Sequence, residues 1–358
     1  MEFRGQSVVV TAVAVAGVMA LAAAEASAQD RVNWKMQSAF GGQLPHLGTA
    51  GVRFTENMER VSDGAFEIEF FEPGALVPAL ECFDAASRGS VEACWTTPGY
   101  HTGKIPALAF FTAVPFGPQY GEFFAWKRFG GGDELKNKIY AQHNLYSLDC
   151  NAIGPETSGW FRQPVESLDD LNGLKMRFFG LGAQVVQKLG VSTQLLAAAD
   201  IYPALERGVI DATEFSMPAM DIELGFYQVA KNNYFPGWHQ QVSVNELLMH
   251  KPAWDALSDQ HKAMLELTCG EQIHYNYAET EANNPDAMNK MVSENGVTVQ
   301  RWTDEQLAAF EEAWQAVLEE QSAADPTFKE VADSYLAFRD RYKTWGQAQF
   351  LKSTYLGQ

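Results

Sequence analysis

The chain has 358 residues, with 26 Lys and Arg against 45 Asp and Glu, so its formal net charge at pH 7 is −19. This acidic balance argues against nucleic acid as a partner, because binding to phosphates needs a basic face. A small anion would have to be held by one local positive group, against the overall field of the protein.

The N-terminal segment has the layout of a secretory signal peptide. Arg4 gives a positive start, residues 8–24 form an apolar run, and Ala26-Ser27-Ala28 is a small-residue cleavage site. A membrane anchor is the alternative, but the run is rich in alanine, short for a span and not followed by a positive flank. We therefore expect residues 1–28 to be removed on export, which leaves about 330 residues, a usual length for two domains.

Strands and helices alternate along the first part of the mature chain. Strand-like segments at 32–40 and 66–73 flank a segment whose apolar residues recur at helical spacing. Residues 79–98 have the pattern of a helix that Gly89 ends, followed by a short strand into Thr96. This β-α-β-α-β order predicts a parallel sheet covered by helices.

The same order returns in the second part of the chain. We expect helices at 182–190 and in the first half of 200–215, and strands at 146–156, in 167–179, at 192–197, near Glu214 and within 226–257.

Two long helices are predicted near the C-terminus. Ser258 can cap a helix that runs to about Glu294. Thr303 and Gln306 form a capping box, which begins a helix whose apolar face is formed by Leu307, Phe310, Trp314 and Val317.

The four cysteines of the mature chain do not define a site by their spacing. They match no zinc-binding pattern. Export allows disulfides, but the three complete pairings of four cysteines cannot be told apart from the sequence. Free buried thiols and one or two bridges both stay open for Cys82, Cys94, Cys150 and Cys269.

Two α/β units in one exported chain are typical of a bilobal binding protein, which closes on a ligand in the crevice beside the strand ends. They are also compatible with an exported enzyme. The chain has no GxSxG, HExxH or Walker A motif. Its seven histidines are scattered, and no two are four residues apart as a helical metal site would require.

Arg177 is the positive group that departs most clearly from its surroundings. It stands between Met176 and Phe178 in a strand-like apolar run. If that strand is buried, the guanidinium must be paired, because burying a lone charge costs more than packing gains. A carboxylate is its geometric match, and it can belong either to the protein, as a structural salt bridge, or to a ligand.

Two acids raise a similar question. Glu214 lies at the carboxyl end of a predicted strand, where open α/β sheets hold ligands. Glu156 ends another strand, and its nearest cationic neighbour in sequence is Arg162. Two such carboxylates in one lobe would repel each other unless a hard cation lay between them. An exposed loop position is the alternative for each acid.

The runs IYPALERGVIDA (201–212) and YFPGWH (234–239) are the most specific in the chain. With the segments around them they closely resemble the solute-binding proteins of tripartite ATP-independent periplasmic (TRAP) transporters, of the DctP-like family. The resemblance covers nearly the whole mature chain, is strongest from 150 to 241, and points to the branch that binds α-keto acids or lactate with a metal ion.

The resemblance implies a periplasmic, non-enzymatic transport component with an α/β, bilobal periplasmic-binding-protein fold, in which a hinge and a long helix join two α/β lobes. Lobe I would comprise 29–150 and about 241–270, and lobe II 151–240 and parts of about 271–325. The tail, 326–358, would be helical and is a candidate for homodimerisation. The protein would deliver a small monocarboxylate, a 2-oxo acid or lactate, to the small and large TRAP membrane subunits.

For the site, the resemblance implies that Arg177 binds the ligand carboxylate. A calcium or sodium ion would be held by the side chains of Glu156, Glu214 and Gln240 and by the backbone oxygen of Phe215, and would bridge to the ligand. The family usually has glutamine at 156 and glutamate at 240. The exchange in this chain keeps two carboxylates and one amide around the ion. Phe215 stands where the family often has tryptophan, which changes the pocket wall.

In lobe I, the resemblance implies ligand-facing loops that contain Phe40, Trp95 and Tyr100. We expect these aromatic residues to cover the apolar end of the ligand, although an aromatic at such a position can equally belong to the lobe core. Tyr100 is the first candidate because its hydroxyl can also donate a hydrogen bond.

Two further functions stay open at this point. An exported metal-dependent lyase or hydrolase acting on 2-oxo acids would use Glu156 or Glu214 as a base, with His239 as the only spare group for proton transfer. A sensor-domain partner with the same fold would share the pocket and differ only in the protein to which it docks.

Overall fold

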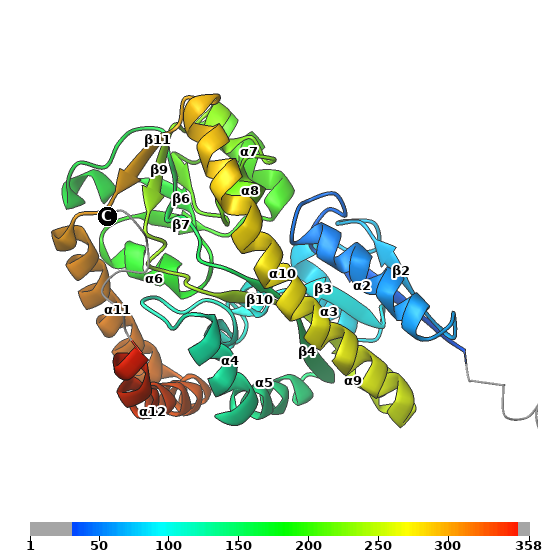
Figure 1. Cartoon of the computed structure of the whole chain (residues 1–358). Helices are drawn as coiled ribbons and strands as arrows, with labels where there is room; N and C mark the ends of the chain where they lie inside the picture. Colours follow the sequence, from blue (N-terminus) through cyan, green and yellow to red (C-terminus); the bar gives the residue numbers. More distant parts are fainter. Residues whose placement is uncertain (1–30, 350–358) are drawn as a thin grey trace, which may run out of the picture.

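The computed structural model describes residues 31–349, and the expected signal peptide lies outside this range. The described residues form two sheets with helices around them, and one long helix runs along both (Figure 1). We call the two halves lobe I and lobe II. Within residues 31–349, no helix combines the length and the apolar character that crossing a membrane requires.

The sheet of lobe I has five strands in the order β2-β1-β3-β10-β4. Strand β1 pairs in parallel with β2 and β3, which confirms the parallel sheet predicted for the start of the chain. Strand β10 is antiparallel to both of its neighbours. The strands are β1 (Val32–Ser38), β2 (Phe66–Phe71), β3 (Ala93–Thr96), β4 (Leu145–Ile153) and β10 (Ser243–His250).

The sheet of lobe II has six strands in the order β11-β9-β5-β8-β6-β7. Strand β5 is antiparallel to β8 and β9, and the remaining pairs are parallel. The strands are β5 (Gly159–Phe161), β6 (Lys175–Arg177), β7 (Ser192–Gln194), β8 (Ala212–Thr213), β9 (Asn232–Phe235) and β11 (Thr298–Arg301).

Helices cover both sheets. The shorter ones are α2 (Gly48–Val61), α3 (Cys82–Ser87), α4 (Tyr120–Phe129), α5 (Gly132–Ala141), α6 (Gly180–Lys188), α7 (Ala198–Glu206), α8 (Pro218–Asp221) and α9 (Lys251–Asp255). Two 3₁₀ helices, η2 (Pro98–His101) and η3 (Pro106–Phe111), lie between β3 and α4.

Helix α10 (Asp259–Ser293) runs across both lobes, as Figure 1 shows in yellow. The Ser258 hydroxyl accepts a hydrogen bond from the backbone N–H of His261 at 3.2 Å, which confirms the predicted cap. The helix contacts β4 and α2 of lobe I and α8 of lobe II. A disulfide, Cys150–Cys269, ties it to β4, and a second, Cys82–Cys94, joins α3 to β3.

The chain passes between the lobes at the ends of β4 and β10. These strands are paired in the lobe I sheet, with Ser243 opposite Ile153. The chain leaves lobe I after β4 and returns to it at the start of β10. Both connections therefore lie side by side, and residues next to them belong to the boundary between the lobes.

Buried charges fix α4 and α5 to these same strands. The ammonium groups of Lys127 and Lys136 lie 2.8 and 2.5 Å from the two carboxylate oxygens of Asp149 on β4. Burial opposes ionisation of this carboxyl, but the two lysines hold the pKa of Asp149 well below its usual value. Because an unpaired charge would be costly here, the network holds the helices in one position.

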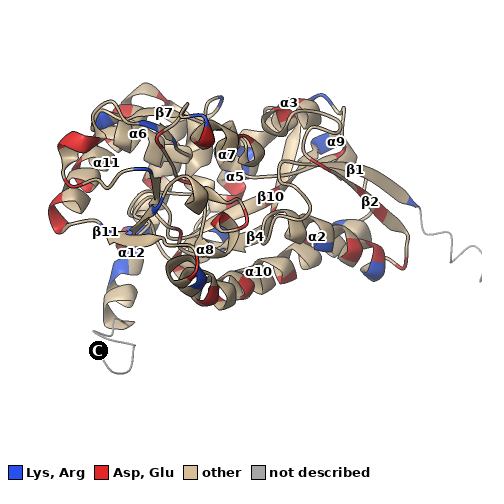
Figure 2. Ribbon diagram, turned by 90° about the horizontal axis from the view of Figure 1, so that it is seen from above, with Lys and Arg blue, Asp and Glu red and all other residues tan. Residues whose placement is uncertain are grey.

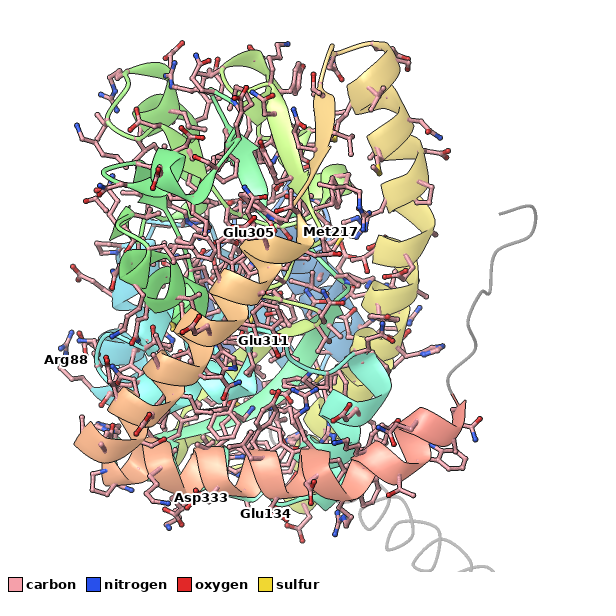
Figure 3. All side chains as sticks on the ribbon, turned by 90° about the vertical axis from the view of Figure 1, so that its left-hand side faces the viewer. Arg88, Glu134, Met217, Glu305, Glu311 and Asp333 are labelled. Carbon is pink, nitrogen blue, oxygen red and sulfur yellow. A yellow bond between two sulfur atoms is a disulfide. The ribbon has the colours of Figure 1, made fainter. Side chains whose placement is uncertain are left out.

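The C-terminal helices α11 (Asp304–Ala324) and α12 (Pro326–Gln349) meet at a corner, which Figure 3 shows from the side. The capping box of Thr303 and Gln306 is present, as predicted. Helix α11 packs against α6 of lobe II, whereas α12 packs against η3, α4 and α5 of lobe I. Phe328 and Tyr335 are buried in that contact, so the first half of α12 is bound to its own chain.

Candidate functional site

A cavity with an empty volume of about 330 Å³ lies between the lobes. Leu47, Thr97 and Asn245 of lobe I contribute to its wall, together with Phe179 and Ser216 of lobe II. Of the predicted ligand and metal residues, the wall includes Phe40, Tyr100, Glu156, Arg177, Phe215 and Gln240.

Strand pairing places Arg177 beside Glu214. Arg177 ends β6 opposite Thr213 of the parallel neighbour β8, so Glu214 follows at the carboxyl end of that neighbour. The Nη1 group donates to the Glu214 Oε2 atom at 2.9 Å and to the Glu214 backbone oxygen at 2.6 Å. The Nε group donates to the backbone oxygen of Leu196, and the guanidinium also lies within hydrogen-bonding reach of the Tyr100 hydroxyl. The arginine therefore has protein partners and also lines the cavity in which a ligand would lie.

The Glu214 carboxylate has one occupied oxygen and one free oxygen. Oε2 accepts from Arg177 and from the backbone N–H of Phe179 at 3.0 Å. Oε1 is fully buried and has no hydrogen-bond partner among the described residues. Although burial opposes its ionisation, the Arg177 guanidinium holds the pKa of Glu214 below its ordinary value. Glu214 is therefore an anion with one oxygen to spare.

Glu156 is arranged in the same way. Its Oε1 atom accepts a hydrogen bond from the Ser216 hydroxyl at 2.9 Å, whereas its buried Oε2 atom has no hydrogen-bond partner in the described part of the chain. Burial, together with the nearby Glu214 carboxylate, raises the pKa of Glu156 to about 7. A cation beside Oε2 would offset both of these effects.

His239 lies between the two acids. Its Nε2 atom is 3.5 Å from Glu156 Oε2 and 3.7 Å from Glu214 Oε1. Burial opposes a charged imidazole, but the two carboxylates outweigh it and raise the pKa of His239 to about 9. Its ring thus supplies positive charge between two acids that would otherwise repel each other.

The two carboxylates fit a cation, which would take over the charge-balancing role of the protonated His239 ring. Ligand atoms of Glu156, Glu214 and His239 all lie within 4.8 Å of one another. Two of these ligand atoms are carboxylate oxygens without hydrogen-bond partners. Hard cations such as calcium and sodium prefer oxygen ligands of this kind. Gln240 lines the same cavity and can add an amide oxygen.

The segments that carry Glu156 and Gln240 touch through their backbones. The Glu156 N–H donates to the Gln240 carbonyl at 3.3 Å. A Cβ atom at Gly237 would lie closer than 3.0 Å to the carbonyl carbon and oxygen of Glu156. The turn between β9 and β10 can therefore approach Glu156 only because residue 237 is glycine.

Aromatic rings form the apolar wall of the cavity. The ring of Tyr100 lies 5.7 Å from the ring of Phe40 and 5.7 Å from that of Phe179, measured between centroids. The Arg177 guanidinium carbon lies 5.3 Å from the centre of the Phe215 ring. Burial raises the pKa of Tyr100 to about 12, despite the nearby Arg177, so its hydroxyl keeps its proton as a donor.

Trp95 is placed differently from the expectation. Its indole N–H donates to the Leu47 backbone oxygen at 2.8 Å, and its ring stacks on Phe54 at 5.7 Å. The side chain is fully buried and belongs to the core of lobe I rather than to the cavity wall. Trp95 lies within β3 and packs toward α2, whereas the cavity wall takes up this segment only at Thr97, after the strand has ended.

Sequence reasoning missed Phe179 and Ser216 and considered His239 only as a proton-transfer group. Ser216 follows a predicted site residue directly, and Phe179 is two residues from Arg177. Proximity in sequence was thus the available signal, but it does not tell which side chains turn toward the site.

Comparison with known proteins agrees with this geometry. Residues 41–325 match the family described as bacterial extracellular solute-binding protein, family 7, or DctP. The chain belongs to this family: it is a TRAP solute-binding protein and not an enzyme.

Three similar proteins carry more detail. A monocarboxylate 2-oxoacid-binding periplasmic protein of Nostoc sp. is 33% identical over 89% of this chain and 87% of its own length. A TRAP solute-binding protein of Bordetella bronchiseptica, solved as a dimer with copurified calcium and picolinate, is 34% identical with a TM-score of 0.87, covering 89% of this chain and 95% of its own. One of Pseudoalteromonas atlantica, with bound sodium and pyruvate, is 26% identical with a TM-score of 0.85, covering 89% and 97%.

Proposed function

We propose that this protein captures a small monocarboxylate, a 2-oxo acid such as pyruvate or a 2-hydroxy acid such as lactate, together with a calcium or sodium ion. The observation that carries the proposal is the pair of buried carboxylate oxygens without hydrogen-bond partners in a site that also holds the Arg177 guanidinium. The similar proteins that bind pyruvate, picolinate or 2-oxo acids support it.

Each side chain has a role in this proposal. Arg177 binds the ligand carboxylate, and Tyr100 donates a hydrogen bond from lobe I. Glu156, Glu214, Gln240 and the backbone oxygen of Phe215 hold the cation, which would supply a positive charge for the carboxylate and the neighbouring oxygen of the ligand. Phe40 and Phe215 exclude water from the apolar end of the ligand.

We further propose that the protein acts in the periplasm after removal of residues 1–28 and delivers its ligand to the membrane subunits of a TRAP transporter. Ligand binding in the crevice favours the closed arrangement of the lobes, and that arrangement presents a different surface from the open one. Both acidic and basic residues occur along the ribbons of the two lobes (Figure 2).

Calorimetry with purified protein tests the function. Pyruvate and lactate titrated in calcium buffer should bind, and chelation of the ion should weaken the binding by at least about tenfold, because the cation binds both protein and ligand. A parallel titration in sodium buffer with chelator separates the two ions, and succinate serves as a dicarboxylate control. Turnover of either acid, or no binding of any monocarboxylate, would contradict the proposal.

We also propose that the protein forms a homodimer through the end of α12. The last turns of this helix project away from both sheets in Figure 2. Trp345, in these turns, and Leu336, near the middle of the helix, expose 59% and 42% of their surface. The dimeric protein of Bordetella bronchiseptica also supports this proposal.

Substitution of Trp345 tests the dimer. Sedimentation of the mature chain should give a dimer, and Trp345→Glu should give a monomer, because a charge cannot be buried in an apolar contact. Thr344→Glu adds the same charge at the neighbouring exposed position and is the matched control. A dimer that persists in Trp345→Glu at micromolar concentration would show that this surface is not the contact.

A further inference from the structure

One contact between the lobes leaves no room for a side chain. Gly99 belongs to η2 of lobe I, and Phe179 follows β6 of lobe II. A Cβ atom built at Gly99 would lie closer than 3.0 Å to three atoms at the end of the Phe179 ring. Cβ atoms in proteins essentially never approach that closely, so the ring occupies the space that any other residue at position 99 would need.

The need for glycine at this position is one of space and not of backbone conformation. Glycines with positive φ in residues 31–349 include Gly180 and Gly190, whereas Gly99 has an ordinary backbone angle. Alanine could therefore adopt the backbone of residue 99 without strain. The three atoms nearest to a Cβ at this position all belong to the ring from the other lobe.

The Phe179 ring is connected to the ligand site. The backbone N–H of Phe179 donates to Glu214 Oε2 at 3.0 Å, and the same oxygen accepts from Arg177 Nη1 at 2.9 Å. The ring meets the edge of Tyr100, another residue of lobe I, and lines the cavity. The position of the ring therefore depends on the carboxylate that pairs with the arginine.

We propose that the contact between Phe179 and Gly99 holds the two lobes together when they close over the ligand. This proposal rests on the proposed function, because the lobes would close over the same ligand. With Arg177 and Glu214 in place, the backbone of Phe179 is fixed and its ring fits against Gly99, which holds η2 of lobe I on lobe II. Gly99 is thus a positioning residue, which does not itself line the cavity.

A double-mutant cycle tests this proposal. Gly99→Ala places a methyl group in the path of the ring and should weaken pyruvate binding in calcium buffer by about 10-fold or more, with a smaller ligand-induced decrease in the radius of gyration. In a Phe179→Ala background, the same Gly99→Ala change should have little further effect on either quantity, because the ring is no longer there. Gly103→Ala is the matched control, since a Cβ at Gly103 meets nothing within 4 Å.

Three results would overturn the proposal: wild-type binding and compaction in Gly99→Ala, an equal cost of Gly99→Ala in both backgrounds, or full ligand-induced compaction in Phe179→Ala. The compaction of Phe179→Ala can be measured even if the Gly99→Ala protein does not fold. If the proposed function is wrong, the wild-type protein binds no pyruvate. If only the role of this contact is wrong, the wild-type protein binds pyruvate and one of the three results above is obtained.

Discussion

Replacing Arg177 by alanine is expected to weaken the binding of pyruvate by at least about 30-fold, and calorimetry in calcium buffer measures this directly. The variant loses the donors for the ligand carboxylate. It also leaves the fully buried Glu214 carboxylate without its closest ion-pair partner, so that His239, 3.7 Å away, is the remaining positive group beside it. Truncating one member of such a pair costs about 2–5 kcal/mol, much of it from the charge left behind.

Two controls separate binding from stability in this experiment. Arg207→Ala removes an exposed arginine of lobe II, whose Nε donates to the backbone of Pro203, and should bind as the wild type does. Arg177→Lys keeps the charge but loses the planar fork, so its affinity should fall between the two. Wild-type affinity in a folded Arg177→Ala protein would show that the arginine serves only as the partner of Glu214.

The exchange of Glu156 and Gln240 predicts a second large effect. Glu156→Gln removes one of the two buried carboxylates and should lower the affinity for calcium by about tenfold. Adding Gln240→Glu should restore it, because the Glu156 N–H donates to the Gln240 carbonyl and the two residues face the same cavity. Titration of calcium into metal-free protein, followed by pyruvate, measures both steps.

The double variant has a clear control in Gln240→Glu alone. That single change adds a third carboxylate beside Glu156 and Glu214, and should raise calcium affinity while destabilising the metal-free protein through repulsion between like charges. A double variant that binds calcium no better than Glu156→Gln would show that position 240 does not complete the cation site.

Local chemistry explains which helices could be predicted. Ser258 and the pair of Thr303 and Gln306 satisfy backbone N–H groups within one turn, so a few residues mark the start of α10 and α11. No element was predicted at α4 and α5. Lys127 and Lys136 are buried there against Asp149, whereas a sequence pattern places lysine on the exposed face of a helix.

The site could be predicted only in part for a related reason. The sequence shows that Arg177 needs a partner, but Glu214 becomes that partner only because β6 and β8 are parallel neighbours. The resemblance supplied Glu156 and Gln240 as a pair. His239 lies in a turn without periodicity, and nothing in the sequence places its ring between two acids.

Gly237 has a consequence for how related chains can be compared. Because its segment meets Glu156 backbone to backbone, the distance between positions 156 and 240 is set by main-chain atoms and does not depend on which side chain each position carries. A carboxylate and an amide can then exchange places during evolution without rebuilding the turn. A glycine at 237 is therefore a marker of the site architecture, and a relative with a larger residue there would have to hold its ligand by a different arrangement of oxygens.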